Sequence, residues 1–315
     1  MTNDSSVKKG VFSGTVRGNK RIGERFYRLR LEFSGAASSA FAQCGPGQFV
    51  QLDLSGTALP PGKDIAENLT DAAQRRILLR RPFSFADVTA KGDKTFGEIL
   101  YCTVGPASLR MTTLKAGDSI SVIGPLGRGF WVPEGKKTAL LAAGGMGAGP
   151  LQHLAKVLTA DYPTMQVTAF AGAKTVKELP FERRLDEVAR NLGFSLPEFA
   201  QYGMESLVAT DDGSAGYHGL LTNCLAEWLG QSDLRGQDMV IYGCGPEAML
   251  AGLAEIAQDR KIDCQVSMER MMACGIGLCQ SCAVECKGDR PDKTIYKLCC
   301  KDGPVFESKE VVFAL

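Results

Sequence analysis

The chain has 315 residues, and its 36 lysines and arginines against 35 aspartates and glutamates leave a net charge of +1. This balance gives no bulk attraction to nucleic acid or to an acidic membrane surface, so we expect neither as a partner. No apolar run approaches the roughly 20 residues of a membrane-spanning helix. The opening MTNDSSVKKG also lacks the apolar core of a secretion signal. These features predict a cytoplasmic protein with room for two or three domains.

The first part of the chain predicts a small antiparallel β-barrel. Short runs such as QFVQLDL, EILYCTV and DSISVIG are separated by Gly, Pro and Asp turns between residues 11 and 131. Many short strands in such a length are typical of a barrel. The polar stretch at about 55–76, which contains Pro and Gly, predicts a surface insertion between two strands. We therefore expect a first domain over residues 1–133.

The second part predicts a five-stranded parallel Rossmann-like sheet over residues 134–267. Five apolar strands, from TALLAAG to DCQVSME, alternate with helical stretches near 151–158, 182–190, 220–229 and 247–259. Five strands joined by four crossovers are typical of a doubly wound α/β domain. The alternation stops near Met268, so residues 268–315 form a small third domain.

Cysteines concentrate in that third domain. The chain has eleven cysteines, and six of them fall between Cys274 and Cys300. The segment MMACGIGLCQSC has C-x4-C-x2-C spacing, which with a distant fourth cysteine is typical of plant-type 2Fe–2S sites. Gly275 and Gly277 fit this interpretation, because the loop must curl around sulfide with positive φ and close N–H groups.

The spacing therefore predicts Cys274, Cys279 and Cys282 as ligands of a 2Fe–2S cluster. It leaves the fourth ligand open among Cys286, Cys299 and Cys300. A zinc site and plain buried thiols are the alternative interpretations, although zinc usually takes two C-x2-C-like hairpins and only one is evident here.

The segments ERMMACGIGLCQSC and LCCKDGPVF resemble the electron-transfer subunits of NAD-linked, two-subunit dihydroorotate dehydrogenases, which belong to the ferredoxin-reductase superfamily. In that family the fourth ligand immediately precedes a KDGPVF-like segment, so the resemblance implies Cys300. The resemblance extends over nearly the whole chain. The doubled cysteine, the long N-terminus and the 55–76 insertion depart from the family pattern.

The segment LLRRPFSF suggests a flavin site. Arg81 can fork onto phosphate oxygens, Pro82 can bend the strand, Phe83 offers an apolar face and Ser84 a small polar group. R-P-x-S alone is a weak signal, and a surface arginine beside a strand-edge proline is the commoner explanation. The resemblance implies that this segment binds FAD.

The resemblance extends the predicted FAD site to a second strand. It implies that Leu100, Tyr101 and Cys102, with the turn at Ala107 and Ser108, contact the ribityl and pyrophosphate part. Family members usually carry Arg where Cys102 stands and Gly-Thr where Ala107 and Ser108 stand, so one phosphate contact differs.

The segment TALLAAGGMGAGPLQHLAKVL predicts a strand, a glycine loop and a helix. The free N–H groups at a helix start suit phosphate, and Gly144, Gly145 and Gly147 allow close approach. The loop is not G-x-G-x-x-G, and the next strand does not end in an acid, which excludes an ordinary Rossmann dehydrogenase. The resemblance implies that this loop binds NAD(P)H, whereas a tight strand–helix turn is the structural alternative.

A second nicotinamide segment is YGCGPEAM, which places Cys244, Gly245 and Pro246 at the carboxyl edge of the sheet. The resemblance implies that these residues lie beside the nicotinamide and the flavin. Asp211 and Asp212 end the third strand, where a carboxylate can bond a ribose and favour NAD over NADP. Turn chemistry of the Asp-Gly kind is the alternative.

The resemblance implies an electron path between the FMN of a dihydroorotate dehydrogenase catalytic subunit and NAD, through the 2Fe–2S cluster and FAD, in pyrimidine biosynthesis. It also implies a heterotetramer with two copies of each subunit. We assign no catalytic acid or base. Alternatives are a reductase subunit of an oxygenase, a hydrogenase or a ferredoxin:NADP oxidoreductase, and a non-enzymatic redox sensor.

Overall fold

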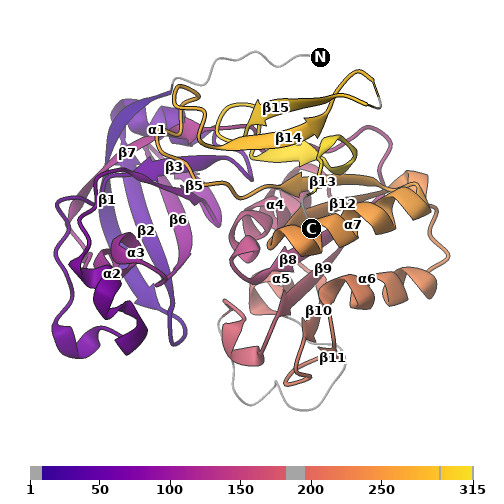
Figure 1. Ribbon diagram of the computed structural model, residues 1–315, viewed down its shortest axis with the longest axis horizontal. Helices are drawn as coiled ribbons and strands as arrows, with labels where there is room; N and C mark the ends of the chain where they lie inside the picture. The colour runs from indigo at the N-terminus through magenta and orange to yellow at the C-terminus, as the bar shows by residue number, and fades with distance from the viewer. Residues whose placement is uncertain (1–8, 182–195, 291, 314–315) are drawn as a thin grey trace.

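The computed structural model describes residues 9–181, 196–290 and 292–313. Within these residues the chain forms two seven-stranded sheets and a two-stranded hairpin. Figure 1 shows the first sheet on one side, the second sheet with its helices on the other, and the hairpin above them. The helix predicted at 182–190 lies outside the described residues. No helix in the described ranges is long and apolar enough to cross a membrane.

The first sheet is antiparallel throughout and has the strand order β4-β3-β7-β1-β2-β6-β5. It curls into an open half-barrel, with β4 and β5 at the two ends, so the predicted antiparallel architecture is confirmed although the barrel does not close. Its strands are β1 (Gly10–Arg21), β2 (Phe26–Ser34), β3 (Phe49–Leu52), β4 (Arg81–Ser84), β5 (Asp87–Lys91), β6 (Lys94–Cys102) and β7 (Ser119–Leu126).

Helix α1 (Gly35–Phe41) packs against β2, β6 and β7 and contributes Ala37 and Phe41 to the core of the half-barrel. The ring of Phe41 stacks on that of Phe33 in β2, with centroids 4.1 Å apart. In β3, Val50 and Leu52 belong to this core, whereas Phe49 belongs to the core beneath the second sheet. Because side chains alternate along a strand, Gln51 lies on the same face as Phe49.

The segment predicted as a surface insertion does lie between two strands, β3 and β4, and it has short helical turns of its own. Leu69 and Ala73 are buried against Leu109, so this segment packs on the half-barrel through a small apolar cluster. The elements involved are η1 (Gly62–Asp64), η2 (Glu67–Leu69), α2 (Thr70–Gln74) and α3 (Pro106–Met111).

The second sheet has the order β11-β10-β9-β8-β12-β13-β16, parallel up to β13 and antiparallel at β16. All five predicted strands are present, but the sheet has two more. β11 has only two residues, too few for a pattern, and β16 comes from the cysteine-rich region. The strands are β8 (Thr138–Gly144), β9 (Gln166–Ala173), β10 (Glu205–Thr210), β11 (Tyr217–His218), β12 (Met239–Cys244), β13 (Asp263–Ser267) and β16 (Val305–Glu307).

Helices cover both faces of this sheet, which is why β8 and β12 are buried along their whole length. The helices predicted near 151–158, 220–229 and 247–259 are confirmed. They are α4 (Ala148–Asp161), α6 (Leu221–Gly230) and α7 (Glu247–Arg260), and the shorter elements are α5 (Pro197–Ala200), η3 (Gly145–Gly147), η4 (Val176–Glu178), η5 (Gly236–Asp238) and η6 (Ser308–Glu310).

The cysteine-rich region carries the hairpin of β14 (Ala283–Lys287) and β15 (Thr294–Leu298). Val284 and Cys286 of β14 are fully buried and share one apolar cluster with Leu250 of α7. The region is therefore packed onto the parallel sheet. The exact domain limits at residues 133 and 267 stay predictions.

Two polar clusters join the half-barrel to the parallel sheet. Arg28 on β2 donates to Glu98 Oε1 on β6 (2.6 Å), to Gln152 Oε1 on α4 (3.1 Å) and to Glu198 Oε1 on α5 (3.1 Å). One helical turn along α4, the Lys156 ammonium contacts the Asp87 carboxylate of β5 at 2.5 Å. These contacts hold the two sheets in one arrangement around the space between them.

Candidate active site at the junction of the two sheets

One pocket, with a volume of about 1040 Å³, occupies this junction. That volume lies just above the roughly 300–1,000 Å³ range of small-molecule sites, so it suits a large cofactor. The pocket brings together the flavin and nicotinamide segments that the sequence predicted. The predicted residues that line it are Pro82, Phe83, Ser84, Leu100, Tyr101, Cys102, Gly144, Gly145, Cys244 and Pro246.

Three residues of the predicted FAD site do not line this pocket. The Arg81 guanidinium donates to the carbonyl oxygens of Leu79 (2.8 Å) and Arg80 (3.2 Å), within its own segment. Ala107 and Ser108 are buried in the first turn of α3, where the sequence predicted a simple turn. The Ser108 hydroxyl accepts two backbone N–H groups there. The cofactor roles of these three residues stay predictions.

Gly147 and Gly245 also lie outside the pocket lining. Both positions require glycine, because the backbone of another segment approaches them closely. A Cβ on Gly147 would lie 1.9 Å from the carbonyl oxygen of Cys244, and one on Gly245 would lie 2.8 Å from Cα of Gly144. The glycine loop and the C-G-P turn therefore touch each other directly. This contact fixes the position of both nicotinamide segments at the carboxyl edge of the sheet.

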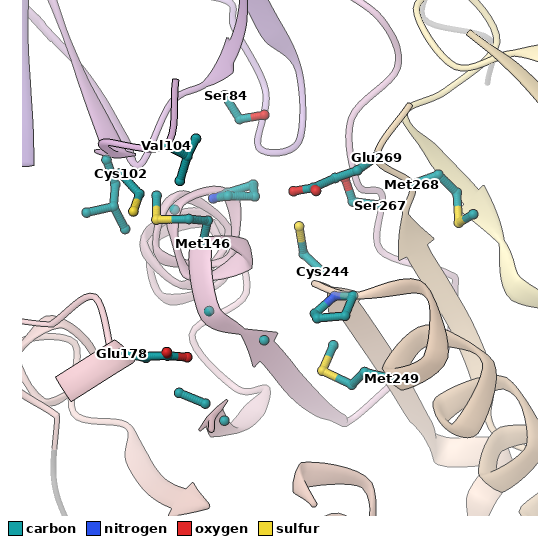
Figure 2. Close-up of a pocket in the computed structure, with 18 of the residues that line it drawn as sticks. Ser84, Cys102, Val104, Met146, Glu178, Cys244, Met249, Ser267, Met268 and Glu269 are labelled. Carbon is teal, nitrogen blue, oxygen red and sulfur yellow. The ribbon is translucent and has the colours of Figure 1, made fainter. Parts of the chain in front are cut away.

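Cys244, Ser267 and Glu269 form one wall of the pocket. In Figure 2 the Cys244 thiol and the Glu269 carboxylate both point into it, with Ser84 on a different wall. Burial raises the pKa of Cys244 to about 12, and the nearby Glu269 adds to the rise. Burial also raises the pKa of Glu269. Cys244 is therefore a neutral thiol at neutral pH and not a nucleophile.

The sequence did not indicate Glu269 as a site residue. The available signal was its place at the end of the last predicted strand, DCQVSME, at the edge where ligands bind. Charged residues elsewhere in the pocket were also missed because they come from connecting segments. Arg25, between β1 and β2, and Glu178, after β9, form an ion pair of 3.8 Å. Arg270 is held by Glu247 at 2.9 Å.

The two aspartates predicted to bind a ribose have different surroundings in the structure. Asp211 lines the pocket, as does Lys174 of the neighbouring strand end. Asp212 accepts hydrogen bonds from the Ser214 hydroxyl (2.6 Å) and backbone N–H (3.0 Å), which is the turn chemistry given above as the alternative.

The four predicted cluster ligands come together as two pairs. The N–H of Cys279 donates to Cys274 Sγ at 3.4 Å, and the N–H of Cys300 donates to Cys282 Sγ at 3.4 Å. Among the described residues, no three His, Cys, Asp or Glu side chains converge closely enough to hold a single metal ion. A 2Fe–2S cluster takes four thiolates for two irons, so this two-plus-two arrangement suits it.

The backbone around these thiols also fits a cluster. Gly275 and Gly277 have φ of +71° and +88°, which confirms the predicted need for glycine. The N–H of Ile276 donates to Cys274 Sγ at 3.5 Å, and that of Gly277 donates to the Cys300 sulfur. Sulfur atoms that accept N–H groups are typical of iron–sulfur sites.

Hydrogen bonds from Ser281 and then from Cys274 lower the pKa of Cys279 to about 6. The thiolate form needed for a metal ligand is therefore already favoured at this position.

The remaining candidates for the fourth ligand are directed elsewhere. The Cys299 thiol donates to the carbonyl oxygen of Met268 at 3.2 Å and is fully buried, and burial raises its pKa to about 12. Cys286 is buried in β14, where its backbone bridges to Val311. This arrangement favours Cys300, and the choice stays a prediction.

Comparison with known families matches two regions of the chain. Residues 269–312 match the iron–sulfur cluster binding domain of dihydroorotate dehydrogenase B. Residues 141–255 match the oxidoreductase NAD-binding domain. The chain is also 35% identical to the electron transfer subunit of dihydroorotate dehydrogenase B (NAD(+)) from Bacillus caldolyticus, over 95% of this chain and 97% of that protein.

The chain belongs to the family of dihydroorotate dehydrogenase B electron transfer subunits. A second member, from Caldanaerobacter subterraneus subsp. tengcongensis, is 33% identical over 95% of this chain and 97% of its own length. Membership of this family confirms the resemblance carried by ERMMACGIGLCQSC and LCCKDGPVF. The matched domains confirm the predicted iron–sulfur and NAD-binding regions.

Solved structures agree with the fold of this family member. An NADH-dependent reduced ferredoxin-NADP oxidoreductase superposes with a TM-score of 0.70 at 24% identity, covering 95% of this chain and 90% of the other. The predicted ferredoxin-reductase architecture is therefore confirmed.

Proposed function

We propose that this chain carries electrons between the FMN of a dihydroorotate dehydrogenase catalytic subunit and NAD, in pyrimidine biosynthesis. One observation carries the proposal. The pocket lined by the predicted flavin and nicotinamide segments is also lined by Met271 and Met272, which immediately precede the ligand loop that begins at Cys274. The printed names of the curated relatives support the same role.

FAD, NAD and a 2Fe–2S cluster supply the chemistry when bound, since nicotinamide and flavin exchange two electrons and the cluster carries one at a time. The residues of the chain orient and tune these groups. Ser84 and Cys244 are placed as neutral polar groups at the pocket wall, and Gly144 and Gly145 admit a phosphate to the sheet edge. Asp211 supports NAD rather than NADP, because a carboxylate there disfavours a 2′-phosphate.

The catalytic partner is proposed to cover the cluster loop. Three large apolar side chains around the thiols are exposed: Met271 (88%), Leu278 (77%) and Ile276 (48%). Apolar side chains gathered at one exposed loop are typical of a contact surface. The FMN content of that partner, a heterotetramer with two copies of each subunit and a cytoplasmic location stay predictions.

The test is purification followed by a visible spectrum with iron and flavin counts. We expect two irons and one FAD per chain, a flavin band near about 450 nm, and bleaching by NADH. Cys279→Ser should abolish the cluster absorption and transfer to the catalytic subunit, while NADH still reduces the flavin. A colourless protein after anaerobic reconstitution would exclude the proposal, and a protein that binds flavin without bleaching would support a sensor instead.

A further inference from the structure

A buried glutamine without a partner lies between the half-barrel and the cluster loop. Gln51 on β3 has no exposed surface, and within the described residues neither its amide nitrogen nor its amide oxygen has a hydrogen-bond partner. Burying an amide without a partner costs free energy, because the group loses its hydrogen bonds to water. A side chain of this kind in a well-packed interior indicates a partner other than the protein atoms.

The position of Gln51 identifies which group that partner is. A Cβ on Gly275 would lie 2.3 Å from Gln51 Nε2, 2.7 Å from its Cγ and 2.9 Å from its Cδ. The amide is therefore packed directly on the glycine that follows Cys274. The N–H of Ile276, one residue further on, already donates to Cys274 Sγ, so donors around this loop face sulfur.

Gln51 is also the direct neighbour of the predicted flavin segment in the first sheet. In the pairing of β3 with β4, Gln51 stands opposite Pro82, and Pro82 lines the pocket. Gln51 itself does not line the pocket, and its amide packs on Gly275 of the cluster loop instead. Gln51 is thus a residue of the half-barrel that touches the cluster loop and stands beside the predicted flavin segment.

We propose that Gln51 donates its amide N–H to sulfur of the iron–sulfur cluster and raises the reduction potential of that cluster. The donor acts through the negative charge on sulfur, which grows when the cluster is reduced, so a hydrogen bond there favours the reduced form. In this proposal Gln51 contacts the cluster directly, from the strand that pairs with the predicted flavin segment. The inference rests on the proposed presence of the cluster at this loop.

The experiment compares Gln51→Met with Gln265→Met in the intact protein. Methionine keeps the length of the side chain and removes the donor. Gln265 is the matched control, because it is also buried but its amide is satisfied by the Trp131 backbone at 2.7 and 3.1 Å. A redox titration followed by electron paramagnetic resonance measures the cluster, and visible absorbance follows the flavin.

We expect Gln51→Met to lower the ratio of reduced to oxidised cluster about tenfold at a fixed potential, which is about 59 mV for one electron. Gln265→Met should lower the melting temperature and leave the cluster potential unchanged. A Gln51→Met protein with an unchanged cluster potential, or with a shift in the flavin potential alone, would overturn the inference. Wild-type protein without iron would instead contradict the proposed function itself.

A measurement on the wild-type chain keeps the test independent of how the variant folds. Protein labelled with ¹⁵N in glutamine side chains should show a hyperfine coupling between the reduced cluster and an amide nitrogen. Labelled Gln51→Met should lose this coupling, whereas labelled Gln280→Met, which removes the glutamine inside the ligand loop, should retain it. If the wild-type protein shows no such hyperfine coupling, the hydrogen bond from Gln51 to the cluster is excluded.

Discussion

The doubled cysteine at 299 and 300 shows how two adjacent residues differ in chemistry. The Cys300 sulfur accepts the N–H of Gly277 and lies beside Cys282, whereas the Cys299 thiol points to the Met268 carbonyl oxygen. We therefore predict that Cys300→Ser loses the cluster, because three thiolates do not replace four. Iron content and absorbance measure the result.

Cys299→Ser is the control for that substitution. It should keep both irons, since serine can donate to the same carbonyl oxygen, with at most a modest loss of stability. Full iron content in Cys300→Ser together with loss in Cys299→Ser would reverse the assignment.

Removing the metal exposes the unequal acidity of the thiols. The pKa of Cys279 is lowered to about 6, chiefly by Ser281, whereas burial raises that of Cys299 to about 12. Only the thiolate reacts with iodoacetamide, so labelling of iron-free protein at Cys279 should rise as the pH rises through about 6. Mass spectrometry between pH 5 and about 8 checks this.

Ser281→Ala should move the labelling of Cys279 to higher pH, because the hydroxyl that stabilises the thiolate is lost. A midpoint near the ordinary thiol value in the unaltered chain would contradict the prediction.

At the scale of single residues, the spacing of cysteines along the sequence predicted those site residues whose partners are close in sequence. Cys274, Cys279 and Cys282 and the glycines between them follow from C-x4-C-x2-C alone. Gln51 and Glu269 could not be predicted, because their roles depend on segments that only the fold brings beside them. In the sequence Gln51 is one polar residue of an ordinary strand, and only the fold shows that Gly275, far along the chain, packs against it.

The junction of β8 with α4 depends on one glycine. A methyl group on Gly147 would collide with the Cys244 carbonyl, although its own φ of −59° suits any residue. We predict that Gly147→Ala lowers stability by about 1–3 kcal/mol, as overpacking does, and weakens NADH binding. Thermal unfolding and a titration with NADH measure the two effects.

Gly149, two residues further on, provides the matched control. A Cβ there would make ordinary contact with Leu100 at 3.6 Å, so Gly149→Ala should leave the melting temperature unchanged or raise it. Equal losses in both variants would show that the Cys244 contact does not govern this junction.

Among the elements, the long periodic ones were predictable and the short ones were not. The apolar runs of β8 and β12 and the helices α4, α6 and α7 were identified from pattern alone. β11 and β16 were missed, since neither is long enough to show a period. The insertion before β4 forms helical turns because Leu69 and Ala73 meet α3, and this pairing is not local.

At the scale of the whole molecule, Arg28 is the centre of one of the two polar clusters that join the sheets. Its guanidinium joins carboxylates on β6 and α5 and an amide on α4, and its side chain is only 12% exposed. We predict that Arg28→Met destabilises the protein by about 3 kcal/mol, because Glu98 and Glu198 lose a partner in a largely buried site. Denaturant unfolding measures the loss.

Arg17→Met is the control, and it tests whether the loss of any paired arginine in this sheet lowers the free energy of unfolding as much as Arg28→Met. Arg17 pairs with Glu32 at the surface, where Lys94 also contacts that carboxylate, so the cost should stay below about 1 kcal/mol. Similar losses for both variants would argue against a special role of the junction.

The pairing of β13 with β16 has a consequence for how this protein was built. Ser267 stands opposite Val305, so the chain leaves the sheet and returns to it at a single point. Neighbouring antiparallel strands can be joined by a two-residue turn. The iron-bearing unit is thus closed at its base by one pair of strands, and a short turn between Ser267 and Val305 would leave the strand order of the nucleotide-binding sheet unchanged.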